Sequence, residues 1–148
     1  YGYDAAGRQT LTRDALGNLT RNAYNANGEV VTITDALNRT TQFLYDALGR
    51  VVETRFPDGT KTITIYDALG RVIAETDQAG ITTQFEYDAL DKLTDVVDAL
   101  GQRTEYGYDA EGNLITQKDA QANTTTYQYD SVSQRLATIL PLGQRSTQ

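Results

Sequence analysis

The 148-residue sequence contains no cysteine, no histidine and no tryptophan, and it has only two prolines. Without cysteine, no disulfide can support the fold, and the redox compartment cannot be inferred from the chain. The absence of both cysteine and histidine excludes the usual zinc sites, Ser-His-Asp triads, Cys-His pairs and histidine pH switches. No apolar run approaches the roughly 18 residues that a membrane-spanning helix needs. These absences remove the commonest metal, nucleophilic-enzyme and membrane-helix classes.

Positive charge is also scarce. Thirteen Lys and Arg residues stand against twenty Asp and Glu residues, which gives a formal net charge of −7 at pH 7. Nucleic acids and anionic membrane surfaces are bound by clustered Lys and Arg, and this sequence has no such cluster. We therefore predict no nucleic-acid partner and no membrane insertion.

What the sequence does contain is a period of 21 residues. A Tyr-Asp pair begins at residues 3, 45, 66, 87, 108 and 129, and Tyr24-Asn25 fills the one gap in the series. Seven units of this length account for 147 of the 148 residues, so residues 1–148 are predicted to form a single array of about seven repeats. Tyr1 and Gln148 occupy the same phase of the repeat, which is expected of a segment from a longer array.

Two turn motifs recur in the repeats. Asp-x-x-Gly follows the Tyr at residues 4–7, 46–49, 67–70 and 109–112, and a second copy lies about ten residues later at 14–17, 77–80 and 98–101. Pro57-Asp58-Gly59 and Pro141-Leu142-Gly143 replace the second motif in two repeats. Asp at the first position of a type I turn accepts a backbone hydrogen bond, and Gly at the fourth adopts the positive φ. Both motifs predict hairpin turns.

The segments between the turns alternate in polarity. Thr41, Phe43 and Tyr45 show a spacing of two that recurs in other repeats, while intervening residues such as Gln42 and Glu86 are mostly polar. Residues two apart lie on the same face of a strand, so the tyrosines are predicted to line one face and to be more buried than their neighbours. Helical periodicity is absent. We predict an all-β antiparallel meander of about two strands per repeat, curling into a curved wall or shell segment.

The odd period adds a constraint on the sheet. Paired residues on neighbouring strands lie on the same face, so a shift of 21 residues would move every side chain to the opposite face if both turns had the same parity. The Tyr face survives only if the two turns differ in parity or if one strand carries a bulge. A type I turn with a Gly bulge supplies such a change.

These motifs resemble those of the Rhs/YD-repeat family, whose consensus is approximately Tyr-Asp-x-x-Gly-Arg-(Leu/Val). Residues 45–51 and 66–72 match it fully, and residues 3–8 match up to the last position. Asp91 and Ser133 replace the Gly in repeats five and seven, and residues 134–136 look shifted by one. The resemblance covers the whole chain.

The resemblance implies a scaffold. In bacterial polymorphic toxins and insecticidal toxin complexes, such repeats form a shell around a toxic C-terminal polypeptide, and in teneurins they form an extracellular adhesion module. It therefore implies a secreted or cell-surface protein whose partners are flanking repeats, further copies paired edge to edge, or an enclosed toxin polypeptide. The self-cleavage segment of the family contains an Asp-Pro pair that this chain lacks, so no catalytic residue is carried over.

Three functions are compared. The leading hypothesis is a non-enzymatic wall segment, and the alternative is an adhesion or binding module that contacts glycan or protein through an exposed aromatic face, or a chain that assembles through its edge strands. An enzyme would depend on carboxylate pairs such as Asp95 with Asp98 or Glu105 with Asp109. The turn aspartates do not fit calcium-binding loops. We therefore predict no catalytic, cofactor-binding or metal-binding residues and no cofactor.

Overall fold

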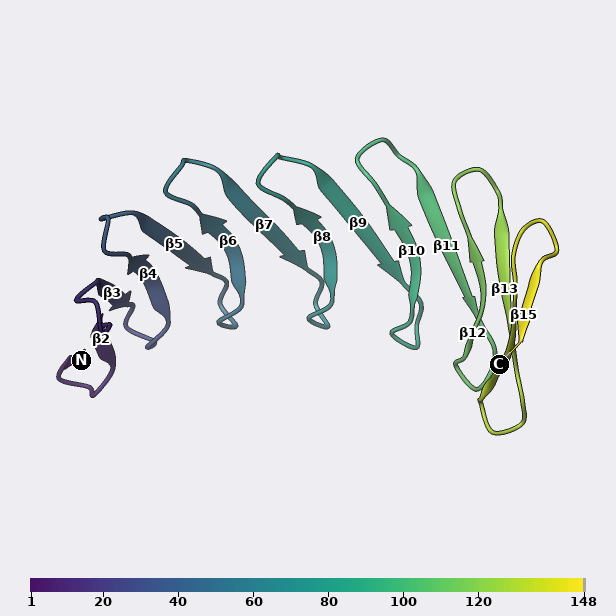
Figure 1. The fold of residues 1–148 in the computed structure, drawn as a ribbon, viewed down its shortest axis with the longest axis horizontal. Helices are drawn as coiled ribbons and strands as arrows, with labels where there is room; N and C mark the ends of the chain where they lie inside the picture. Colours follow the sequence, from purple (N-terminus) through teal and green to yellow (C-terminus); the bar gives the residue numbers. More distant parts are fainter. Residues whose placement is uncertain (148) are drawn as a thin grey trace. The chain divides into compact units, whose positions relative to one another are not determined.

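The structure is a computed structural model that describes residues 1–147. Within this range there are fifteen β-strands and no helix, and the strands follow one another in the sheet in sequence order (Figure 1). The predicted all-β antiparallel meander is confirmed, and the short strands at the two ends make the strand number one larger than expected. The strands are β1 (Gly2–Tyr3), β2 (Gln9–Arg13), β3 (Leu19–Tyr24), β4 (Val30–Thr34), β5 (Thr40–Tyr45), β6 (Val51–Arg55), β7 (Lys61–Tyr66), β8 (Val72–Thr76), β9 (Thr82–Tyr87), β10 (Leu93–Val97), β11 (Arg103–Tyr108), β12 (Leu114–Lys118), β13 (Thr124–Tyr129), β14 (Arg135–Ile139) and β15 (Arg145–Thr147).

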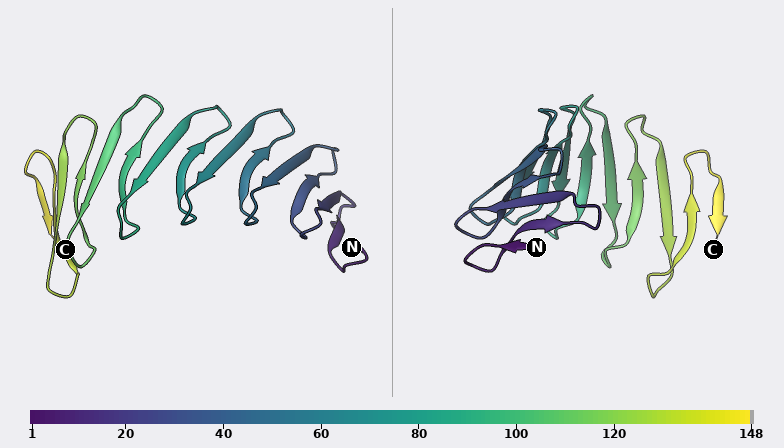
Figure 2. Two further views of the ribbon diagram at one scale, coloured as in Figure 1. Left: turned by 180° about the vertical axis from the view of Figure 1, so that it is seen from behind. Right: turned by 60° about the vertical axis from the view of Figure 1, so that its left-hand side comes forward.

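The chain divides into two compact units. Unit 1 comprises residues 1–71 and 75–81, and unit 2 comprises residues 72–74 and 82–148. Strands β1 to β7 of unit 1 pair antiparallel with their sequence neighbours, and β9 to β15 of unit 2 do the same. Within each unit the strands form one layer joined by tight turns (Figure 2).

Both predicted turns are present, and they have the same geometry. In the first, the Asp4 amide donates to the Arg8 carbonyl at 2.9 Å and the Gly7 amide donates to the Asp4 carbonyl at 3.0 Å. The turn that starts at Asp14 repeats this pattern, with distances of 3.0 and 3.1 Å. This is a three-residue hairpin loop built on a type I turn followed by a left-handed residue. Where the sequence lacks Gly at that position, another residue takes the positive φ: Asn38, Asp91, Ala122 and Ser133, with φ between 59 and 65°.

The parity constraint is met by a bulge and not by different turns. In β6, Tyr45 pairs with Val51 and Leu44 pairs with Glu53, so Val52 is the extra residue. The same one-residue shift follows the Tyr in the pairings β1–β2, β3–β4, β9–β10, β11–β12 and β13–β14. A bulge reverses the parity once per repeat, which keeps the tyrosines on one face although the period is odd. The bulge was one of the two predicted solutions, and it is confirmed.

Pairing also staggers the repeats. Arg21 lies opposite Thr34, which lies opposite Thr40, so the lateral neighbour two strands away is 19 residues on in the chain. In unit 2, Glu86, Asp95 and Glu105 show the same offset. Since the repeat is 21 residues long, each repeat slides two residues along the strand direction relative to the one before. Side chains from one repeat are thereby brought over the turn of the next.

The sheet has no conventional core. Among the described residues, Ala137 alone is fully buried, at 2% exposure, and no polar side chain is. Leu and Val residues at the turn tips, such as Leu48 and Leu69, are well exposed. Stability must therefore come from strand pairing and from contacts between adjacent repeats, summed along the array.

Candidate functional site

In three repeats the first turn is held by its Asp and the Arg four residues later. Asp46 Oδ1 accepts hydrogen bonds from the amides of Leu48, at 2.9 Å, and Arg50, at 3.1 Å, while Arg50 Nε donates to Asp46 Oδ2 at 2.7 Å. The hydrogen bond from the Arg50 side chain lowers the pKa of Asp46, and partial desolvation opposes it. The Asp4–Arg8 and Asp67–Arg71 turns repeat these contacts. Asp and Arg of the motif therefore form a local pair that closes the turn.

The hydroxyl groups of the repeat tyrosines donate hydrogen bonds to backbone carbonyls of the preceding repeat. The hydroxyl of Tyr45 donates to the carbonyl oxygen of Val30 at 2.7 Å, fifteen residues earlier. Equivalent bonds join Tyr24 to Gln9 (2.7 Å), Tyr66 to Val51 (3.3 Å), Tyr87 to Val72 (2.8 Å) and Tyr108 to Leu93 (2.9 Å). Val30 lies beyond the last residue pair between β4 and β5, so the hydroxyl satisfies a carbonyl that the bulge has removed from the ladder. Partial burial raises the pKa of the Tyr108 hydroxyl, which keeps its proton available for donation.

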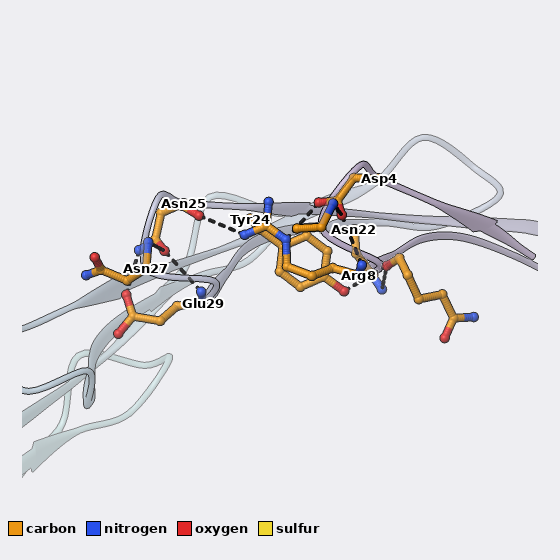
Figure 3. A network of polar contacts seen from close by, with 9 residues as sticks. Asp4, Arg8, Asn22, Tyr24, Asn25, Asn27 and Glu29 are labelled. Atoms are coloured by element: carbon orange, nitrogen blue, oxygen red, sulfur yellow. Dashed lines mark hydrogen bonds and ion pairs between the residues drawn. The ribbon is translucent and has the colours of Figure 1, made fainter.

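The Arg of the motif reaches forwards to the next repeat. The Arg8 guanidinium lies 4.8 Å from the centroid of the Tyr24 ring, and its Nη1 donates to the Asn25 carbonyl at 3.1 Å (Figure 3). Arg50 lies 4.3 Å from the Tyr66 ring and Lys92 lies 5.2 Å from the Tyr108 ring. A cation over an aromatic ring contributes about 0.5–1 kcal/mol at exposed sites. Tyr24, Tyr66 and Tyr108 are thus each bonded through the hydroxyl and covered by a cation, and both contacts come from the preceding repeat.

In the second repeat, different residues make the equivalent contacts within the turn and to the next repeat. Asn25 replaces the Asp and Glu29 replaces the Arg, and the Asn25 amide donates to Glu29 Oε2 at 2.6 Å (Figure 3). A Cβ on Gly49, in the next turn, would lie 2.6 Å from Glu29 Oε1. Gly at the turn therefore has two functions, because it adopts the positive φ of 76° and leaves room for the side chain that crosses from the preceding repeat.

The tyrosines lie on one face, as predicted for Tyr24, Tyr45, Tyr66, Tyr87 and Tyr108, since their hydroxyls reach equivalent carbonyls. All five are half-buried. The residue before the Tyr is exposed in the first four cases, but the turn residue after it is half-buried, and both neighbours of Tyr108 are half-buried as well. The prediction of greater burial is therefore confirmed against the preceding neighbours of four tyrosines, whereas the following neighbours lie in the same half-buried range.

The opposite face carries ion pairs. Arg103 donates to both oxygens of Glu86, at 3.0 and 3.2 Å, and to Asp95 at 2.7 Å. Lys118 pairs with Glu105 at 3.1 Å. These side chains are mostly half-exposed, so each pair contributes little to stability.

The carboxylates considered as catalytic candidates all have structural partners. Asp95 pairs with Arg103 and Glu105 pairs with Lys118. Asp98 accepts the amides of Leu100 and Gln102, and Asp109 accepts the amide of Asn113. Within residues 1–147, no group of three or more acidic side chains is arranged to hold a metal ion. The arrangement therefore supports cohesion between repeats rather than acid–base or metal chemistry.

The contacts between repeats were not anticipated from the sequence. The Tyr, Asp and Gly of the motif were interpreted as a face residue and two turn residues, and the Arg was given no role. A signal was present, because the sixth residue of the repeat is Arg or Lys at positions 8, 50, 71 and 92 and a Tyr follows sixteen residues later each time. The two-residue stagger that brings them together could not be read without the pairing register.

Comparison with known proteins identifies the repeat. The family model described as RHS Repeat matches residues 24–61, 66–103, 87–124 and 108–145, together more than half of the chain. No curated protein matches this sequence. The crystal structure of TcdB2-TccC3 without its hypervariable C-terminal region resembles this fold with a TM-score of 0.71 at 18% identity, over 93% of this chain and 9% of that chain.

Two further structures show the same likeness. The crystal structure of TcdB2-TccC3 gives a TM-score of 0.70 at 18% identity, over 93% of this chain and 9% of that one. The Tc holotoxin pore of Photorhabdus luminescens gives 0.66 at 22% identity, over 81% of this chain and 7% of that one. At these identities the likeness concerns the fold, and this chain spans less than a tenth of each of these proteins.

Proposed function

The chain belongs to the Rhs-repeat family, and on this premise we propose that it is a non-enzymatic segment of the wall of a hollow β-shell. The observation that carries the proposal is the single layer of strands in which Ala137 alone, among the described residues, is fully buried. A globular domain covers at least one face of its sheet with a second layer. A sheet that is held by contacts between successive repeats, with both faces left open, is suited to separate two compartments.

The proposal extends to what the wall encloses. The resemblance to shell-forming toxins supports a polypeptide cargo, and one similar structure is described as lacking a hypervariable C-terminal region. Because this chain covers 7–9% of those proteins, a closed shell would need many more repeats. We propose that they continue the sheet at β1 and β15, each of which pairs with one neighbour among the described strands. Further copies of this chain, paired edge to edge, are the alternative source. A secreted or cell-surface location accompanies this function.

The adhesion alternative has less support. It would be favoured by an exposed aromatic face with unsatisfied polar neighbours. Apart from the exposed Tyr3, the repeat tyrosines are instead half-buried, five of their hydroxyls are hydrogen-bonded, and three of the rings are covered by a cation. These contacts use the aromatic surface that a glycan would stack on.

The absence of native cysteine allows a direct test. Adjacent residues of β9, Thr83 and Gln84, point to opposite faces. Thr83→Cys and Gln84→Cys would be introduced separately into the complete parent protein and treated with a bulky polyethylene-glycol maleimide. A wall predicts that one variant reacts and the other is protected until the protein is unfolded. The isolated 148-residue chain is the control, because both of its faces are open and both variants should react. Equal reaction of both variants in the native parent would refute the shell.

A further inference from the structure

In several repeats the sixth residue, counted from the Tyr, is a long cationic side chain that crosses to the turn of the following repeat. Arg8 Nη1 bonds to the carbonyl of Asn25, and Lys92 Nζ bonds to the carbonyl of Gly112 at 3.4 Å. Arg50 Nη1 lies 3.3 Å from where a Cβ on Gly70 would be. Each of these cations also lies over the Tyr of the next repeat. The chain thus builds the same cation site three times and fills it with its own side chain.

The sixth residue of the next repeat is Asn113, which is too short to make this crossing. Its amide turns back to its own turn and donates to Asp109 Oδ2 at 2.9 Å. The Tyr that corresponds to Tyr24, Tyr66 and Tyr108 is here Tyr129. Its hydroxyl has no hydrogen-bond partner among the described residues, whereas those three donate to carbonyls.

A groove of about 470 Å³ lies at this position, between the turns at residues 109–113 and 130–134 of unit 2. Its lining includes the rings of Tyr127 and Tyr129, the acidic residues Asp109, Glu111 and Asp130, and Ser133. No Lys or Arg is among the described residues that line it. The Arg135 guanidinium lies 5.9 Å from the centroid of the Tyr127 ring, and no cation is recorded over the Tyr129 ring among the described residues. The groove therefore has the aromatic surface and the negative charge of the filled sites without their cation.

We propose that this groove binds the side chain of an arginine or lysine presented by a partner polypeptide. The guanidinium or ammonium group would lie over the Tyr129 ring, as Arg8 and Arg50 lie over their tyrosines. The Glu111 carboxylate makes no ion pair or hydrogen bond among the described residues, so it is available to the incoming cation. Ser133 and Tyr129, which also line the groove, carry hydroxyl groups that can accept hydrogen bonds. The inference rests on unit 2 alone and does not depend on the shell.

Other occupants fit the groove less well. A metal ion would need converging carboxylates, and the described residues provide no group of three arranged for one. A neutral or anionic ligand would leave the Glu111 carboxylate without a partner, so it fits the groove less well than a cation. Loss of the cation does not by itself leave such a groove. In the second repeat the sixth residue is Glu29, and its long side chain still reaches the next turn.

The test uses the full 148-residue chain and the tripeptide acetyl-Gly-Arg-Gly-amide, observed by saturation-transfer NMR. The matched probe replaces Arg by citrulline, which keeps the shape and removes the charge. We expect saturable binding of the Arg peptide with a dissociation constant on the order of millimolar, as suits one cation on a surface ring. Binding of the citrulline peptide should be at least about tenfold weaker, since its side chain carries no charge for the ring or the carboxylates.

Two variants locate the site. Asn113→Arg supplies the missing cation from within the chain, and it should abolish peptide binding and raise the melting temperature. Asn123→Arg is the matched control, because Asn123 bonds to Asp119 in the second turn of the repeat just as Asn113 bonds to Asp109 in the first. This substitution adds the same charge at a position away from the groove. It should leave binding unchanged. Tyr129→Ala should weaken binding about tenfold through loss of the ring.

Several results would overturn the proposal. It fails if the wild-type chain shows no saturable binding, if the citrulline peptide binds equally well, or if Asn113→Arg and Asn123→Arg bind alike. Displacement of the peptide by calcium at micromolar concentration would show a metal site instead. Should Asn113→Arg not fold, Asn113→Lys and Tyr129→Ala carry the same test, and unchanged binding by both would refute the assignment.

Discussion

Removing a single hydroxyl from one repeat tyrosine tests whether the backward hydrogen bonds hold the repeats together. In Tyr45→Phe, the Val30 carbonyl loses a donor at 2.7 Å while the ring and its packing remain. A typical hydrogen bond contributes about 0.5–1.5 kcal/mol net. Because Tyr45 is half-buried, water can partly replace the lost donor. We expect a decrease of about 1 kcal/mol in the free energy of unfolding, or about 2–4 °C in melting temperature for a chain of this size.

Two matched variants make the experiment decisive. Tyr66→Phe removes a bond of 3.3 Å, which is long for an O–H···O hydrogen bond, and it should cost about 0.5 kcal/mol or less. Tyr3 has no hydroxyl partner among the described residues, so Tyr3→Phe should have no measurable effect. Urea titration measures all three, with an unchanged m-value showing that the compactness of the two states is preserved. Equal effects of Tyr45→Phe and Tyr3→Phe would show that the hydroxyl bonds are incidental to stability.

Four further predictions follow from the turns, the exposed pairs and the edges. Gly49→Val and Gly101→Val both place a β-branched residue at a φ of 76°, but only Gly49 faces Glu29. Each substitution should lower the free energy of unfolding in urea titration by about 1–2 kcal/mol or more, and Gly49→Val should lower it more strongly. Glu86→Ala removes a half-exposed ion pair and should change stability by no more than about 0.5 kcal/mol in the same titration, so a cost equal to that of Gly49→Val would contradict the role given to Gly. Hydrogen bonds from the Arg50, Asn18 and Arg39 side chains lower the pKa of Asp46, Asp14 and Asp35 below 3.8, so a pH series of thermal melts should show their stabilisation fully present above about pH 5 and lost progressively as the pH falls through the folded-state pKa values. The isolated chain should associate through β1 and β15, with a scattering mass that rises across a hundredfold concentration range, because an unpaired strand edge recruits further strands; a compact monomer at all concentrations would contradict this.

The local features of the fold were predictable because each is encoded within a few residues. Asp46 and Gly49 specify a type I turn with a left-handed fourth residue, and that turn forms wherever the motif recurs. The alternation of Thr41, Phe43 and Tyr45 specifies a face in the same way. Even the presence of a bulge could be inferred as one of two solutions, since an odd period and a continuous Tyr face are incompatible without a change of parity, although its position at Val52 comes from the structure.

The contacts that join the repeats were not predictable from the same reasoning. Whether Arg50 meets the Tyr66 ring depends on the stagger of two residues per repeat, which follows from where the bulge places the register. The hydroxyl bond from Tyr45 to Val30 depends on the pairing as well, because Val30 lies next to the bulge residue Val31 and beyond the last residue pair between β4 and β5. A sequence period gives the length of the repeat, whereas the lateral alignment of neighbouring strands is a property of the pairing.

The two kinds of contact also explain why the motif contains these residues together. A bulge alone would leave a strand carbonyl unsatisfied in every repeat, and the Tyr hydroxyl satisfies it. The Tyr ring would otherwise be open on its outer side, and the Arg of the preceding turn covers it while its own Asp fixes its direction. Gly70 adopts a positive φ of 89°, and Arg50 Nη1 lies 3.3 Å from where a Cβ would be, so a side chain there would be strained and would crowd the cation. Tyr, Asp, Gly and Arg therefore form one interdependent set, and a repeat that loses the Arg, as at Asn113, leaves a site open rather than only a weaker turn.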